Sequence, residues 1–121
     1  MVRYFDVMRK IIELSDSCLE GIQYIKEHIG CSKDIALLVF YDVVSAIDQM
    51  ERSISICEID IDTTQIEEYL EILWGIIEEV VSILEYHNYD RAKYVFHNFF
   101  LPNYQNLKKE LESILHIYII S

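Results

Sequence analysis

One stretch of this chain, residues 64–87, constrains its fold more than any other. Its apolar side chains alternate spacings of four and three residues without interruption, which is the pattern of one continuous helical seam. The seam comprises Ile66, Leu70, Leu73, Ile77, Val80, Leu84 and His87. Glu71, Glu78 and Glu85 recur at every seventh residue on the opposite side. A helix with one apolar and one acidic face is therefore predicted, and its seam needs neighbouring helices to cover it.

Two earlier stretches, residues 3–29 and 33–56, carry the same alternation and predict two further helices. Gly30 follows the first of them, at a position where helices often end in a residue with positive φ. The second begins with residues 35–41, which are apolar on all sides; such a turn is usually covered on more than one side. Residues 58–62 alternate like a strand, but they have no partner strand and are predicted to form a loop.

Local signals predict where two helices begin and where two backbones approach closely. Thr64 and Glu67 have the spacing of a capping box, in which a hydroxyl and a carboxylate satisfy the free amides of the first turn. Asp90 is a good N-cap for the last helix. Gly75, beside Trp74, would allow a close approach of a neighbouring backbone.

The last helical stretch, residues 90–119, contains the single proline of the chain, Pro102. Proline removes one backbone hydrogen bond and disfavours helix at the residue before it. We therefore expect either one arm kinked at Pro102 or two short helices that meet there. Three full helices and an interrupted fourth, joined by short turns, predict an all-α fold. The architecture is an antiparallel four-helix bundle in which residues 1–121 form a single domain.

The composition argues against several classes of partner. The chain has 21 acidic and 10 basic residues, for a formal net charge of −11. Binding to a nucleic-acid backbone or to an anionic membrane surface needs clustered lysine and arginine. No apolar run approaches the length of a membrane-spanning helix, and the first residues lack the apolar core of a signal peptide. We therefore expect a cytoplasmic protein that binds neither nucleic acid nor membrane.

No motif in the chain predicts a metal or a cofactor. Di-metal sites in bundles need Glu-x-x-His twice, and none of the four histidines has a glutamate three residues before it. Residues 60–71 have the spacing of a calcium loop, but Gln65 stands where the sharp turn needs glycine. Cys18 and Cys57 lie at seam positions, where cysteine packs as a small hydrophobe. Cys31, in a turn, is the one candidate for a reactive thiol.

One short pattern has a chemical interpretation. Arg91 and His97 are separated by five residues and resemble the Arg-x(4–6)-His element of HEPN-superfamily ribonucleases, which are all-helical and usually dimeric. The resemblance implies that His97 would manage the proton and Arg91 would hold the phosphate charge during metal-independent cleavage of RNA at a dimer cleft. Ala92 stands where that family often has a polar residue. The structural interpretation makes Arg91 a surface residue and His97 a partly exposed helix residue.

A second resemblance covers residues 88–107. The run Asn-Tyr-Asp-Arg-Ala-x-x-Val-Phe-x-x-Phe-Phe-Leu-Pro-x-Tyr is similar to the last-helix segment of some small, uncharacterised bacterial bundle proteins. Those proteins have an aromatic and acidic turn, an apolar helix and a Leu-Pro break. The resemblance implies the fold rather than an activity.

Apolar side chains beyond the seams predict a protein-binding surface. They flank the seam of the third helix and fill the last turns of the chain, and they are Trp74, Ile76, Ile83, Leu115, Tyr118 and Ile119. The side chains beside the third seam, and those in the last turns, belong either to the bundle core or to a surface that binds a partner protein or a second copy. We therefore expect a non-catalytic protein that mediates protein–protein interaction or self-association, with the ribonuclease as the alternative. Any chemical site is expected near His87 and the turn that follows it.

Overall fold

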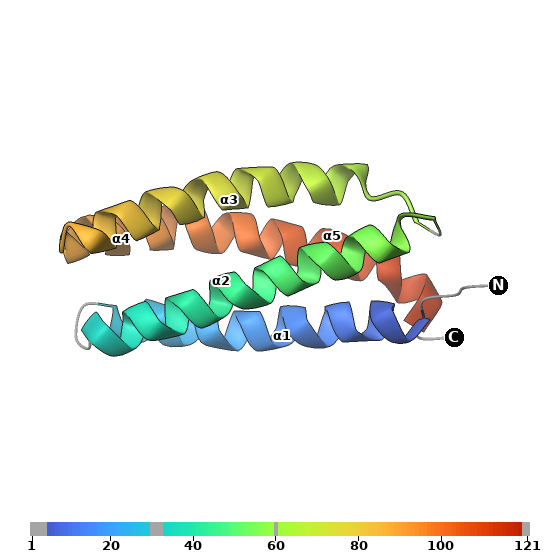
Figure 1. Ribbon diagram of the computed structural model, residues 1–121, viewed down its shortest axis with the longest axis horizontal. Helices are drawn as coiled ribbons and strands as arrows, with labels where there is room; N and C mark the ends of the chain where they lie inside the picture. The colour runs from blue at the N-terminus through green and yellow to red at the C-terminus, as the bar shows by residue number, and fades with distance from the viewer. Residues whose placement is uncertain (1–4, 30–32, 60, 120–121) are drawn as a thin grey trace.

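The computed structural model describes residues 5–29, 33–59 and 61–119. Four helical arms lie side by side along one long axis (Figure 1). The first three arms are α1 (Phe5–His28), α2 (Lys33–Ile56) and α3 (Thr64–Glu85). The fourth arm consists of α4 (Tyr89–Val95), a π-helical segment (Phe96–Phe100) and α5 (Leu101–Ile119). The chain reverses direction between successive arms, so the predicted all-α antiparallel four-helix bundle is confirmed.

The seams identified from the periodicity form the core. Within the described residues, every member of the α3 seam except His87 is buried, and α1 and α2 bury the corresponding positions. Tyr104, Leu107, Leu111 and Leu115 complete the core from α5. Burial of this much apolar surface by four arms is the main force that holds the bundle together.

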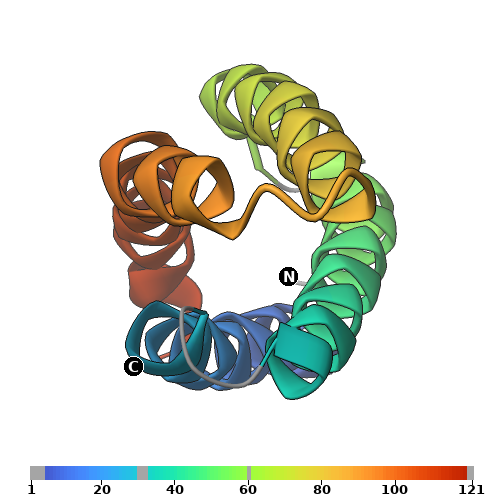
Figure 2. The ribbon, with the colours of Figure 1, turned by 90° about the vertical axis from the view of Figure 1, so that its left-hand side faces the viewer.

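The four arms surround a shared interior when viewed along the bundle (Figure 2). α1 packs against α2 and α5, and α3 packs against α4, the π-helical segment and α5. Three aromatic rings fill the interior at one end: Phe40 of α2 lies 6.3 Å from Phe96 and 5.6 Å from Phe100, measured between ring centroids. α2 and α3 make the fewest contacts of the neighbouring arms.

The fourth arm continues through Pro102 as a helix. The irregularity lies just before the proline, where the amide of Leu101 donates to the carbonyl of Phe96, five residues back. This wider turn inserts one residue into the helix, a common arrangement for a π-bulge. The wider turn lies directly before Pro102, where the proline ring would otherwise clash with the carbonyl of the preceding helical turn. Of the two arrangements expected for this stretch, the structure has the single arm.

Both predicted helix caps are wrong by one or two residues. The N-cap of α3 is Thr63 rather than Thr64, and the Asp62 carboxylate accepts hydrogen bonds from the Thr64 amide at 3.0 Å and the Thr64 hydroxyl at 2.7 Å. The N-cap of the fourth arm is Asn88 rather than Asp90, because the Asn88 side chain accepts from the Arg91 amide at 3.2 Å. In both cases, the side chain that accepts a hydrogen bond from an amide at the helix start lies two residues before the predicted N-cap.

The close helix approach occurs at Gly21, not at Gly75. A Cβ atom built on Gly21 would lie 2.8 Å from Cγ2 of Val43, so the absence of a side chain allows α1 to approach α2. Gly75 lies on the exposed side of α3 with no neighbouring atom near the corresponding position. The close approach that Gly75 would allow is therefore not made by any described residue. Gly30 and Cys31, for which a helix end and a turn were predicted, lie outside the described residues.

Candidate functional site

Arg91 and His97 lie on the same arm but are not joined by a hydrogen bond or an ion pair in the part of the chain that the structure describes. Arg91 is exposed on α4, and its guanidinium lies 3.8 Å from the Glu79 carboxylate of α3. His97 lies in the π-helical segment and is half-buried. Its Nε2 atom is buried and has no hydrogen-bond partner. The ribonuclease interpretation of this pair stays a prediction.

The turn around His87 is a helix-ending motif. His87 has a φ of 59°, and the amides of His87 and Asn88 donate to the carbonyls of Leu84 and Ile83. These two hydrogen bonds define a Schellman C-cap, in which the left-handed position is usually glycine. The His87 side chain is exposed, and its Nδ1 lies 3.2 Å from the Tyr89 hydroxyl. The histidine at the end of the seam therefore terminates α3 outside the core.

The six residues predicted as a partner surface have different environments. Trp74, Ile76 and Ile83 are half-buried on α3, and all three pack against the core. Tyr118 is half-buried in the same way, and Leu115 is fully buried at 0% exposure. Leu115 therefore contributes to the core of the bundle. The side chain of Ile119 lies outside the described residues.

Three exposed apolar side chains of α2 lie in the run that is apolar on all sides, residues 35–41. Ile35, Leu38 and Tyr41 are 49%, 65% and 45% exposed. They follow one another at spacings of three along the helix, so their side chains are neighbours on its outward surface. We call this set the α2 apolar face. Ala36 and Phe40 are buried on the other side, and Leu37 and Val39 are half-buried against the core, so the turn is covered widely but not on the side of Ile35, Leu38 and Tyr41.

A second exposed apolar group lies on the fourth arm. Tyr94 and Phe99 are 54% and 47% exposed, and their rings form an edge-to-face pair with centroids 6.1 Å apart. The π-helical segment places Phe99 on the surface while Phe96 and Phe100 stay buried. This pair and the α2 apolar face occupy the same end of the bundle, where α2 starts and α3 meets α4 (Figure 1). Sequence periodicity did not identify either group as exposed.

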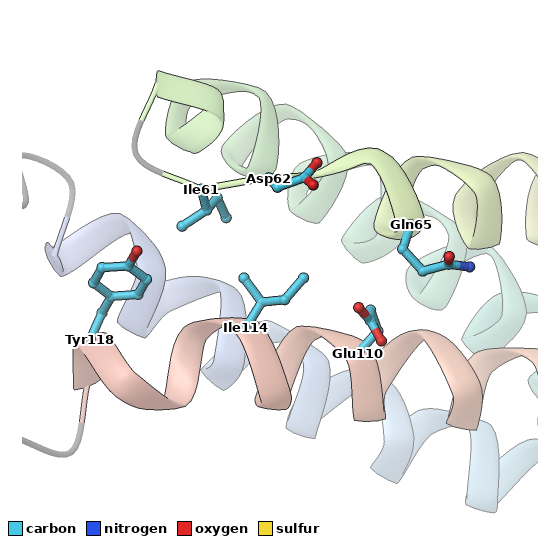
Figure 3. Close-up of a pocket in the computed structure, with 6 residues that line it drawn as sticks. All are labelled: Ile61, Asp62, Gln65, Glu110, Ile114 and Tyr118. Atoms are coloured by element: carbon cyan, nitrogen blue, oxygen red, sulfur yellow. The ribbon is translucent and has the colours of Figure 1, made fainter.

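A groove of about 340 Å³ lies at the other end, between the start of α3 and α5. Six residues line it: Ile61, Asp62, Gln65, Glu110, Ile114 and Tyr118. Tyr118 and Ile114 lie opposite Ile61, and Glu110 lies opposite Gln65, while the Asp62 side chain lies along the wall formed by the start of α3 (Figure 3). The groove combines an apolar floor with two carboxylates. Of the residues predicted from the sequence, Tyr118 is the one found here.

The buried titratable groups stabilise the fold and are poor candidates for chemistry. The Tyr104 hydroxyl donates to the carbonyl of Ser15 at 2.7 Å, and burial strongly raises the pKa of Tyr104. Burial also raises the pKa of the Cys18 thiol to about 11, a shift that the polar Tyr104 hydroxyl partly offsets. A thiol with such a pKa is protonated at neutral pH and is a weak nucleophile.

Within the described ranges, no group of three or more histidine, cysteine, aspartate or glutamate residues is arranged to hold a metal ion. The same residues contain no helix that is both long enough and apolar enough to cross a membrane. The described surface includes the two exposed apolar groups at one end of the bundle and, at the other end, a groove with two carboxylates.

Comparison with known proteins identifies a family. A search of curated proteins and a search of solved structures found no match. Residues 6–110 match the family model described as "Domain of unknown function (DUF8042)". The matched region extends from the start of α1 to the middle of α5 and includes all four arms. The chain therefore belongs to the DUF8042 family.

Proposed function

We propose that this chain is a non-catalytic module that binds another protein molecule, either a partner or a second copy, through the α2 apolar face. The observation that supports the proposal most directly is the 65% exposure of Leu38 between two other exposed apolar side chains. Single exposed apolar residues are normal on a protein surface, whereas adjacent ones are characteristic of interaction sites.

The rest of the chain is consistent with a binding role. The interior is filled by apolar side chains, and its buried thiol and phenol have raised pKa values that make them weak nucleophiles and acids. The exposed ring pair of Tyr94 and Phe99 offers further aromatic surface at the same end. Aromatic side chains supply much of the affinity at protein interfaces, since they bury a large area and lose little conformational entropy.

Affinity capture with matched variants tests this proposal. A tagged protein is incubated in extract of the source cell together with a differently tagged second copy, which detects self-association. Replacing Leu38 and Tyr41 by lysine is expected to reduce the captured protein or second copy about tenfold or more, because two lysines interrupt an apolar interface. The control replaces two other exposed residues by lysine: Ile56, at the opposite end of α2, and Ile59, in the short 3-10 turn Cys57–Ile59 that follows it. Equal capture by both double variants would contradict the proposal.

A further inference from the structure

The negative charge of the chain is concentrated around α3. Ten of the 21 acidic residues lie between Arg52 and Arg91, a segment without any lysine or arginine. The remaining residues are nearly balanced, with eleven acidic and ten basic side chains. The segment includes the last four residues of α2, all of α3 and the start of the fourth arm. A surface of one sign attracts partners of the other sign and repels a second copy of itself.

The groove between α3 and α5 lies at one end of this acidic segment and has no cation of its own. Its six lining residues include no lysine, arginine or histidine. Asp62 is held in place by two hydrogen bonds from Thr64, which also lower the pKa of its carboxyl group. Glu110 is half-buried and, among the described residues, has no hydrogen-bond or ion-pair partner. A partly desolvated carboxylate in this setting gains from an added cation.

The apolar part of the groove favours arginine over a compact cation. Ile114 and the Tyr118 ring lie between the two carboxylates and the end of the groove (Figure 3). An arginine side chain has an aliphatic stem that can lie on Ile114 while its guanidinium reaches Glu110, one turn earlier on α5. The same guanidinium can donate two parallel hydrogen bonds to a carboxylate such as Glu110. Lysine could also place its aliphatic stem on Ile114, but its ammonium lacks the planar pair of donors that matches a carboxylate.

We propose that this groove binds an arginine side chain from a basic segment of a partner protein. The groove and the α2 apolar face lie at opposite ends of α2. The two sites can therefore be tested separately, and the failure of one leaves the other standing. A second copy of this chain is disfavoured as the occupant, because the acidic segments of the two copies would repel each other.

NMR titration with a matched pair of peptides tests the proposal. The probe is N-acetyl-Leu-Arg-Leu-amide, and its control replaces arginine by citrulline, which has nearly the same shape and no charge. The arginine peptide is expected to shift the backbone amide signals of residues 61–65 and 110–118, with a dissociation constant of about 1 mM, typical for one side chain in a shallow groove. The citrulline peptide is expected to bind at least tenfold more weakly.

A pair of protein variants locates the binding. Glu110→Gln keeps the shape of the side chain and is expected to raise the dissociation constant of the arginine peptide about tenfold. Glu85→Gln removes a charge from the far end of α3 and is expected to change this dissociation constant less than twofold. Equal effects of the two variants, equal binding of the two peptides or shifts spread along the whole of α3 would overturn the proposal. Calcium ions that shift the same signals and displace the peptide would also overturn it, since the groove would then be a cation site.

Discussion

The hydroxyl of Tyr104 on α5 donates a hydrogen bond of 2.7 Å to the carbonyl of Ser15 on α1, 89 residues earlier in the chain. Tyr104 is fully buried, so this bond satisfies a hydroxyl that would otherwise be unpaired in the core. One turn along α5, the Lys108 ammonium lies 3.4 Å from the Ser15 hydroxyl and 2.6 Å from the Asp16 carboxylate. These contacts fix the position of the first arm relative to the last.

Tyr104→Phe tests the contribution of this hydrogen bond. The substitution keeps the ring and removes the buried hydroxyl, so the free energy of unfolding is expected to fall by about 1 kcal/mol. Urea unfolding followed by the fluorescence of Trp74, the single tryptophan, measures the change. Tyr94→Phe is the control, since Tyr94 is exposed, and it is expected to be neutral. Equal stability of the two variants would contradict this role of Tyr104.

The buried thiol of Cys18 predicts a loss of stability at high pH. Burial raises its pKa from 9.0 to about 11, so between these values the unfolded chain releases the proton while the folded chain retains it. The free energy of unfolding therefore falls as pH rises through this window, by at most about 1.4 kcal/mol per pH unit from this group. Urea midpoints at pH 8 and pH 10.5 are expected to differ less in Cys18→Ala than in the wild type. The same pH dependence in both proteins would contradict the assignment.

His87 occupies a backbone conformation that glycine adopts more easily. Its φ of 59° ends α3 at a position where most helices of this kind have glycine. His87→Gly is expected to raise the free energy of unfolding by about 0.5–1 kcal/mol, because it removes the strain of a side chain at positive φ. Gly75→Ala is the comparison variant, because Gly75 is a glycine in ordinary helical conformation on the exposed side of α3. A loss of stability in His87→Gly would show that the contact with Tyr89 outweighs the strain.

Variants of His97 test whether this residue has only a structural role or takes part in RNA cleavage. Its buried Nε2 has no partner, so His97→Leu is expected to stabilise the protein by about 1 kcal/mol, whereas His116→Leu at an exposed position is expected to be neutral. Incubation of the wild type and of His97→Ala with single-stranded and structured RNA is expected to leave the RNA intact. Cleavage by the wild type that is lost in the variant would instead support a catalytic role for His97 with Arg91.

The positions that form the core could be predicted because helical periodicity reports directly which side chains share a face. Ile66, Leu70 and Leu73 are buried as their spacing indicates. Helix ends were less predictable, since several polar residues near each start can act as the cap. Asp62 and Asn88 make the capping bonds, and only the folded backbone shows this.

The π-helical segment and the exposed surfaces could not be predicted, because they depend on how the four arms pack together. Pro102 indicates that the fourth arm is irregular, but it does not show where the extra residue is inserted. In the run 35–41, apolar residues on all sides leave open which side the neighbouring arms cover. The packing of four arms decides that Phe40 is inside and Leu38 outside.

Site-specific photo-crosslinking from position 38 tests the central claim, that the α2 apolar face binds another protein molecule. A photoreactive phenylalanine derivative replaces Leu38 in one protein and the exposed Gln105 of α5 in the control. After irradiation in the source cell, we expect a discrete adduct of higher mass from position 38 and none from position 105. The absence of an adduct at position 38, or the same adducts from both positions, would contradict it.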